Sequence, residues 1–73
     1  MRKKLKKKRL EKDLTHKNIA QKADISRAHY TNIELGKKDP SFKVARKIKQ
    51  ALDYYNDDIF LNKDVPNENK KSA

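Results

Sequence analysis

Apolar residues recur every three or four positions through most of the chain, and this spacing predicts a series of short helices rather than strands. The clearest pattern covers residues 14–36, where two apolar stripes are separated by a short polar break. The stripes consist of Ile19, Ala20 and Ala23, followed by Tyr30 and Ile33. We therefore predict two packed helices joined by a tight turn, the second covering about residues 27–35.

Polar residues mark where these helices begin and end. Thr15 and Ser26 stand at N-cap positions, where a hydroxyl accepts a hydrogen bond from a backbone N–H of the first turn. Asn18 occupies the place of the Glu or Gln of a capping box, so we expect only half of that motif. Gly36, the only glycine of the chain, is placed for a left-handed C-cap. The same signals predict a further helix that begins after Ser41.

Weaker patterns flank this pair of helices. Residues 2–12 predict a lysine-rich first helix, and residues 56–60 predict a short fifth helix. The expected anchors of the first helix are Leu5, Leu10 and Leu14. The expected core sides of the fourth and fifth helices consist of Phe42, Ala45, Ile48 and Leu52, and of Ile59 and Phe60. Residues 62–73 are polar and aperiodic, which is typical of a disordered tail, so we place one domain at residues 1–61.

Charge is unevenly distributed along the chain. Residues 1–49 contain 17 Lys or Arg against 5 acidic residues, whereas residues 50–73 contain 3 against 5, within a net charge of +10. A basic body of this kind is typical of a protein that binds a polyanion. Nucleic acids and anionic membrane surfaces both fit this charge, so charge alone does not choose between them.

Several classes of function find no support in the sequence. There is no cysteine for a disulfide or a thiolate metal site, and no apolar run has the length of a membrane span. His16 and His29 have no evident serine partner, and no glycine-rich phosphate loop accompanies them. We therefore expect no enzyme activity, no cofactor or metal, no membrane association and no small-molecule ligand.

The polar face of the helix at residues 27–35 carries side chains that are suited to the major groove of DNA. Arg27 can donate two hydrogen bonds to guanine O6 and N7, and Asn32 can pair with adenine. Ala28 and the methyl group of Thr31 can pack on a thymine methyl. The same residue types are ordinary on a solvent-exposed helix, so the caps, the tight turn and the core stripes carry the hypothesis of base reading.

Taken together, these positions resemble the Cro and phage-repressor type of helix-turn-helix regulators, the XRE family. The matching positions are Leu14, Thr15, Ile19, Ala20, Ile25, Ser26, Tyr30, Ile33, Glu34, Gly36, Pro40 and Ser41. The resemblance covers about residues 4–61 and extends to the closing residues 57–60. It is specific because many spacings must hold together.

The resemblance implies an all-α, five-helix, phage-repressor-like domain that binds double-stranded DNA as a homodimer. Its operator is expected to be palindromic, with half-sites about 34 Å apart. By this resemblance Arg27, Ala28 and Asn32 face bases, while Thr31 and His29 lie near the groove wall. We expect a sequence-specific transcriptional repressor of bacterial or phage-derived origin, located in the cytoplasm on the nucleoid.

The resemblance also implies a structural ion pair and contacts with the DNA backbone. Arg9 matches the family's first-helix arginine, which pairs with the glutamate that corresponds to Glu34. The start of the second helix, with His16 and Lys17, is expected to lie over phosphates. His16 replaces the family's usual glutamine, which leaves open whether this side chain bridges to the third helix.

Three further positions depart from the family's pattern. Asp24 and Asp53 stand where the family has glycine, and aspartate tolerates the left-handed conformation at some strain. Lys8 occupies a position that is often apolar, so we expect the first helix to pack shallowly there.

Residues outside the motif supply the remaining candidates. Lys37, Lys38 and Lys43 are candidates for phosphate contacts because they follow the third helix and begin the fourth, although each is equally compatible with a solvated lysine. Tyr55 and Leu61 are candidates for dimer contacts, since a core this small gains from burial between subunits.

Two other hypotheses remain open at this point. The first is an antitoxin-like or adaptor protein that uses the same fold mainly to bind a protein partner, with residues 62–73 as the binding segment. The second is RNA binding, although the sequence lacks the exposed aromatic platforms on which single-stranded RNA stacks.

Overall fold

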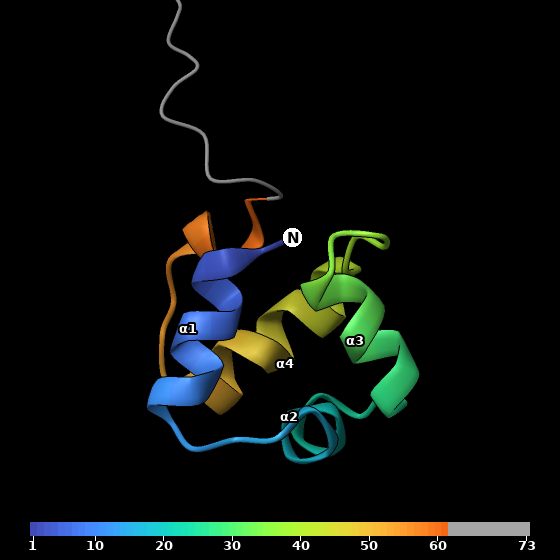
Figure 1. The fold of residues 1–73 in the computed structure, drawn as a ribbon, viewed down its shortest axis with the longest axis horizontal. Helices are drawn as coiled ribbons and strands as arrows, with labels where there is room; N and C mark the ends of the chain where they lie inside the picture. The colour runs from blue at the N-terminus through green and yellow to red at the C-terminus, as the bar shows by residue number, and fades with distance from the viewer. Residues whose placement is uncertain (62–73) are drawn as a thin grey trace, which may run out of the picture.

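In the computed structural model, residues 1–61 are described, and they form four α-helices and one turn of 3-10 helix, with no strand among them (Figure 1). The elements are α1 (Lys3–Glu11), α2 (His16–Ala23), α3 (Arg27–Glu34), α4 (Phe42–Leu52) and η1 (Asp57–Phe60). In Figure 1, η1 lies beside α1 on one flank, α3 forms the opposite flank, and α4 crosses between them. The tail predicted at residues 62–73 lies outside the described residues. Within residues 1–61, no helix has the length and apolar character needed to cross a membrane.

The predicted fifth helix is a single 3-10 turn, so the count of five helices is not confirmed. η1 begins after Asn56, whose side-chain oxygen accepts a hydrogen bond from the Asp58 N–H at 2.9 Å. Only four residues follow before the backbone becomes extended at Leu61, and short segments of this kind favour 3-10 over α geometry. Ile59 is fully buried, so the turn still closes the core.

The core draws on all five elements. Its buried apolar residues are Leu5, Ile19, Ala20, Ala23, Tyr30, Ile33, Ile48, Leu52 and Ile59. Two predicted anchors are wrong: Leu10 is 54% exposed and Phe42 is 79% exposed. At about 100° per residue, Leu10 lies roughly 140° around α1 from Leu5, and Phe42 lies roughly 120° around α4 from Ile48. Both side chains therefore point away from the core.

Side-chain caps fix the starts of three helices. The hydroxyl oxygens of Thr15, Ser26 and Ser41 accept hydrogen bonds from backbone N–H groups three residues on, at 3.0, 3.0 and 3.1 Å. The expectation of only half a capping box at α2 is wrong, because Asn18 Oδ1 also accepts from the Thr15 N–H at 3.3 Å. The side chain of Asn18 is one methylene shorter than glutamine and still closes the reciprocal pair.

All four α-helices end at a residue in the left-handed conformation. These residues are Asp13, Asp24, Gly36 and Asp53, with φ of 56°, 61°, 83° and 52°. In each case the N–H of the next residue bonds to the carbonyl five positions back, as from Ile25 to Ala20 at 3.0 Å. The expectation for Asp24 and Asp53 is confirmed, and Asp13 ends α1 in the same way.

Lys8, at the position where shallow packing was expected, is half-buried. Its ammonium nitrogen lies 4.4 Å from the centroid of the Tyr54 ring and 3.5 Å from the Glu11 carboxylate. Lys8 therefore packs on the Tyr54 ring through a cation–π contact.

Candidate nucleic-acid interface

α3 is positioned by the burial of one face and by a cap at its start. Tyr30 and Ile33 are fully buried and face the core. Ser26 Oγ accepts from the His29 N–H at 3.0 Å and satisfies one of the N–H groups that a helix start leaves unpaired. The buried face and the cap therefore hold α3 in place, with its polar side directed outward.

The predicted base-reading side chains fall into two groups along this helix. Arg27 and Ala28, in the first turn, are exposed, and no hydrogen bond or ion pair within residues 1–61 holds the Arg27 guanidinium. His29, Thr31 and Asn32 are half-buried. The Arg27 guanidinium in the first turn of α3 is thus available to an external partner, whereas the side chains of the following turn are packed more closely against the protein.

Arg9 and Glu34, which were expected to pair, are buried and in direct contact. The Arg9 Nε lies 3.3 and 3.2 Å from the two Glu34 carboxylate oxygens, and Nη2 lies 3.2 Å from Oε1. Arg9 Nη1 also donates to the Leu14 carbonyl at 2.8 Å. The pair joins α1, the connection to α2 and the C-terminal end of α3. Removing one partner would leave the other as an uncompensated buried charge.

His16 connects the start of α2 to α3 through both of its ring nitrogens. Nδ1 lies 2.8 Å from Thr31 Oγ1, and Nε2 lies 3.1 Å from Glu34 Oε2. The ring also stands edge-on to Tyr30, with the two centroids 5.4 Å apart. His16 therefore bridges the two helices, and in this arrangement neither nitrogen is open to the phosphate contact expected from the sequence.

Burial shifts the protonation equilibria of two rings in this cluster. Burial lowers the pKa of His16, although the nearby Glu34 carboxylate acts in the opposite direction. Burial, reinforced by the same carboxylate, raises the pKa of Tyr30. Both side chains are therefore held in their neutral forms near pH 7.

Arg2 is a buried residue that the hydrophobic pattern did not reveal, and it holds the C-terminal end of α3. Its side chain is 3% exposed. The guanidinium donates to the carbonyls of Ile33 at 2.5 Å, Lys38 at 3.0 Å and Phe60 at 2.9 Å, and to Asp39 Oδ1 at 2.7 Å. One side chain thus ties α3, the α3–α4 connection and η1 together.

The only sequence signal for Arg2 is its residue type, an arginine within a run of lysines. Two of the four arginines in the chain, Arg2 and Arg9, are buried. Each uses several guanidinium nitrogens at once, in a fixed fork that the single ammonium of lysine cannot reproduce.

The candidate phosphate-binding lysines are exposed. They are Lys17, Lys37, Lys38 and Lys43, and none takes part in an ion pair within residues 1–61. By contrast, Lys47 and Lys49 pair with Asp24 and Asp57, at 3.6 and 2.6 Å. The backbone that carries Lys37 and Lys38 is fixed, because both N–H groups bond to the Asn32 carbonyl, at 2.9 and 3.2 Å. Ammonium groups that are unpaired in the described part of the chain are therefore carried on a loop whose backbone is hydrogen-bonded to the end of α3.

Comparison with known proteins decides the family, since the helix-turn-helix family model matches residues 5–58. The chain is a helix-turn-helix protein of the XRE type. In this helix-turn-helix protein, α2 and α3 are the two motif helices, and residues 24–26 form the turn between them.

Three relatives carry names of the same kind. YqaF of Bacillus subtilis is 45% identical over 73 residues, covering all of this chain and 93% of the relative. A protein of Methanocaldococcus jannaschii is 41% identical over 64 residues, covering 88% of this chain and 97% of the relative. YqaE of Bacillus subtilis is 45% identical over 49 residues, 67% of this chain and 42% of the relative. All are named uncharacterized HTH-type transcriptional regulators. No solved structure gives a significant match.

The helix-turn-helix domain also exposes apolar side chains outside the motif. Tyr55 and Leu61, the candidate dimer contacts, are 63% and 62% exposed. They lie in the α4–η1 connection and directly after η1, and this connection runs along the flank opposite α3 (Figure 1). Phe42, at the first position of α4, is also exposed.

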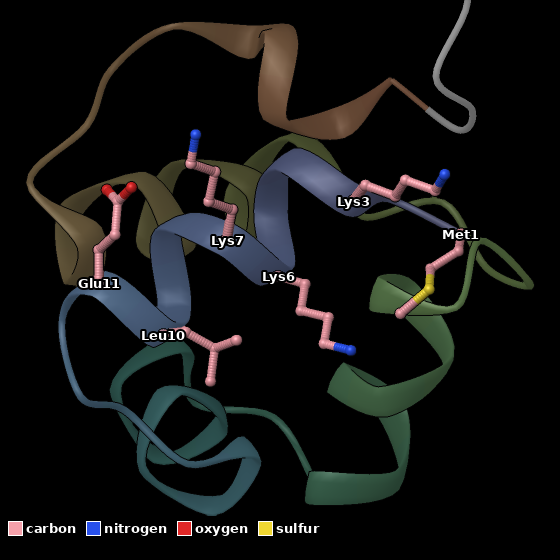
Figure 2. Close-up of a pocket in the computed structure, with 6 residues that line it drawn as sticks. All are labelled: Met1, Lys3, Lys6, Lys7, Leu10 and Glu11. Carbon is pink, nitrogen blue, oxygen red and sulfur yellow. The ribbon is translucent and has the colours of Figure 1, made fainter.

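A shallow hollow of about 630 Å³ lies along the solvent side of α1. It is lined by Met1, Lys3, Lys6, Lys7, Leu10 and Glu11. Figure 2 shows Lys6 and Leu10 pointing to one side of α1, and Lys7 and Glu11 to the other. None of the candidate DNA or dimer contacts lines this hollow.

Proposed function

We propose that this helix-turn-helix protein is a sequence-specific transcriptional regulator that binds double-stranded DNA and acts as a repressor. It inserts α3 into the major groove and binds a palindromic operator as a homodimer. The observation that carries the proposal is the first turn of α3, where Arg27 and Ala28 are exposed on a helix whose opposite face is buried. The family, and the names of the relatives, support the same function.

The geometry of α3 favours direct base reading. The Arg27 guanidinium can form two parallel hydrogen bonds with guanine without first breaking an internal ion pair. The small side chain of Ala28 allows the helix to approach the bases closely. Asn32 lies one turn further along, where its amide can pair with adenine. Because the backbone of α3 is held by its buried face, binding costs mainly the freedom of side chains.

The exposed lysines around the motif supply the affinity that does not depend on sequence. Lys17 lies in the first turn of α2, Lys37 and Lys38 follow α3, and Lys43 lies in the first turn of α4. Each lysine that contacts a phosphate releases a counterion and steepens the plot of log K against log salt by about 0.9.

A homodimer is proposed because one recognition helix reads only one half-site. Two copies related by a two-fold axis would read half-sites about 34 Å apart. Tyr55 and Leu61 are the candidate contacts between copies, and their exposure favours burial in an interface. Repression needs only occupation of the operator, whereas activation also needs a surface for the transcription machinery, so repression is the simpler function for this domain.

Selection from random duplexes tests the proposal. The full chain is used to enrich bound DNA at physiological salt, and the recovered sequences are aligned. We expect a palindromic motif with two half-sites about one helical turn apart, and lost preference at one symmetric pair of positions for Arg27→Ala. Recovery of unrelated sequences, with binding that collapses in modest salt, would contradict base reading and leave a general polyanion binder.

A further inference from the structure

Thr31 is the candidate DNA-facing residue whose polar atom is already engaged inside the protein. Its Oγ1 lies 2.8 Å from His16 Nδ1, and the side chain is half-buried. The other nitrogen of the same ring, Nε2, lies 3.1 Å from Glu34 Oε2. The imidazole therefore links a buried carboxylate to a hydroxyl at the edge of the proposed reading face.

The chemistry of these partners fixes where the hydrogens lie. Glu34 is paired with Arg9, and a carboxylate only accepts hydrogen bonds. His16 Nε2 must therefore carry the hydrogen that it donates to Glu34. A neutral imidazole has a single N–H, so Nδ1 is the acceptor, and the hydroxyl of Thr31 donates its hydrogen inward to Nδ1.

We propose that His16 fixes the direction of the Thr31 hydroxyl, so that Thr31 offers DNA its oxygen lone pairs and its methyl group but no hydrogen. The proposal rests on the proposed function. Its ligand is the exocyclic amino group of adenine or cytosine, which is the hydrogen-bond donor that the major groove presents. Base acceptors, such as guanine O6 and N7, are disfavoured at this position. His16 is thus a positioning residue that contributes to specificity without touching DNA.

The surroundings of the ring keep it in the neutral form that this arrangement needs. Burial disfavours the charged ring, as do the cations Arg9 and Lys6 from α1 and Arg27 from α3, whereas Glu34 favours it. Protonation in acid would make both nitrogens donors. The Thr31 hydroxyl would then accept from Nδ1, and its hydrogen would turn outward. Acid should therefore give Thr31 a hydrogen that it can donate towards the groove, beside one remaining lone pair, and so remove its preference for donors.

The His16 tautomer, which sets the direction of the Thr31 hydroxyl, can be measured without DNA by ¹⁵N NMR of the full chain. At pH 7.5 we expect the ¹⁵N shifts of His16 to show a protonated Nε2 and an unprotonated Nδ1. The opposite tautomer, or a doubly protonated ring at this pH, would overturn the proposal. This readout does not depend on whether the chain binds DNA, so it separates a failure of this inference from a failure of the proposed function.

Binding to modified operators tests the consequence for specificity. The selected operator is synthesised with single adenines replaced by purine, which lacks the amino group, or by 7-deazaadenine, which lacks N7. Cytosines are replaced in turn by an analogue without the 4-amino group. Loss of one amino group should weaken wild-type binding about 2- to 10-fold, and should have no such effect on Thr31→Val, which keeps the shape but lacks the hydroxyl. Two results would overturn the proposal. In the first, the Thr31-dependent loss appears when a base acceptor such as N7 is removed; in the second, no removal of an amino group produces a loss that depends on Thr31.

Two further variants show whether His16 is the cause. His16→Phe keeps an aromatic ring against Tyr30 and removes both nitrogens, so Thr31 should lose its preference for an amino group. If His16→Phe fails to fold, wild-type binding is measured instead at a pH where the ¹⁵N shifts show a doubly protonated His16 ring, because protonation should remove the same preference. Gln50→Ala, at an exposed position of α4 outside the candidate interface, is the control and should keep both the preference at pH 7.5 and its loss in acid. An amino-group preference that is unchanged while the ¹⁵N shifts show a doubly protonated His16 ring would contradict the role of His16.

Discussion

The two ends of α3 are held in opposite ways. At the N-terminal end, the Ser26 side chain caps the helix, and Arg27 is exposed with no ion pair within residues 1–61. At the C-terminal end, Glu34 is locked by Arg9 from α1, and Arg2 bonds to the last carbonyls and the following connection. The difference shows that contacts at the C-terminal end fix the position of α3, whereas the exposed candidate DNA-binding side chain lies at the N-terminal end. Substitutions at the two ends should therefore affect different properties.

The largest effect is expected from breaking the lock at the C-terminal end. Arg9→Met leaves the Glu34 carboxylate buried without its main partner, which should lower the free energy of unfolding by about 3–5 kcal/mol. A domain of this size has a core worth roughly that amount, so the variant should be largely unfolded at 25 °C. Urea denaturation followed by circular dichroism measures the loss.

The matched control for this lock removes both charges together. Arg9→Met combined with Glu34→Leu should recover most of the lost stability, because no uncompensated charge remains. A loss below about 1 kcal/mol for the single variant would mean that water reaches the pair and that the C-terminal end is not locked by it.

Arg2 is the second residue that holds the C-terminal end of α3. Arg2→Met removes four side-chain hydrogen bonds to α3, the α3–α4 connection and η1, and should cost about 2–3 kcal/mol of unfolding free energy. Asp39→Asn is the control, because the Asp39 side chain is 88% exposed and its ion pair should contribute less than about 1 kcal/mol. Equal losses in thermal denaturation would assign the role of Arg2 to the exposed ion pair instead of the buried carbonyls.

This comparison also separates what sequence could and could not predict. The caps and the left-handed helix ends depend on residues within a few positions of each other, so Ser26 and Asp24 were assigned correctly. The partners of Arg2 lie 31 to 58 positions away, and no local pattern marks them. The contact of His16 with Thr31 spans 15 positions and depends on the packing of α2 against α3. Phe42 was misplaced because the helical pattern was extended to the first residue of α4.

At the N-terminal end of α3, a substitution should affect DNA binding instead of stability. Arg27→Ala should weaken binding to the selected operator by about 1–3 kcal/mol, because two hydrogen bonds to one base are lost. Its free energy of unfolding should change by less than about 0.5 kcal/mol, since the side chain is exposed. Fluorescence anisotropy with labelled operator and scrambled duplexes measures both affinity and specificity.

Arg46→Ala is the matched control for Arg27, since Arg46 is also an exposed arginine but lies on α4. It should lower binding to all duplexes alike, if at all, through the loss of charge. An equal loss of operator preference in both variants would mean that sequence specificity does not come from the first turn of α3.

The smallest effect is expected from removing the Ser26 cap at the N-terminal end of α3. Ser26→Ala should lower the free energy of unfolding by about 1 kcal/mol, because the N–H of His29 loses its acceptor. Ser41→Ala removes the equivalent cap of α4, and should cost about the same. Only Ser26→Ala should also reduce operator affinity, since a frayed first turn no longer holds Arg27 in place. If both variants weaken binding equally, the loss follows global stability, and the two ends of α3 are not independent.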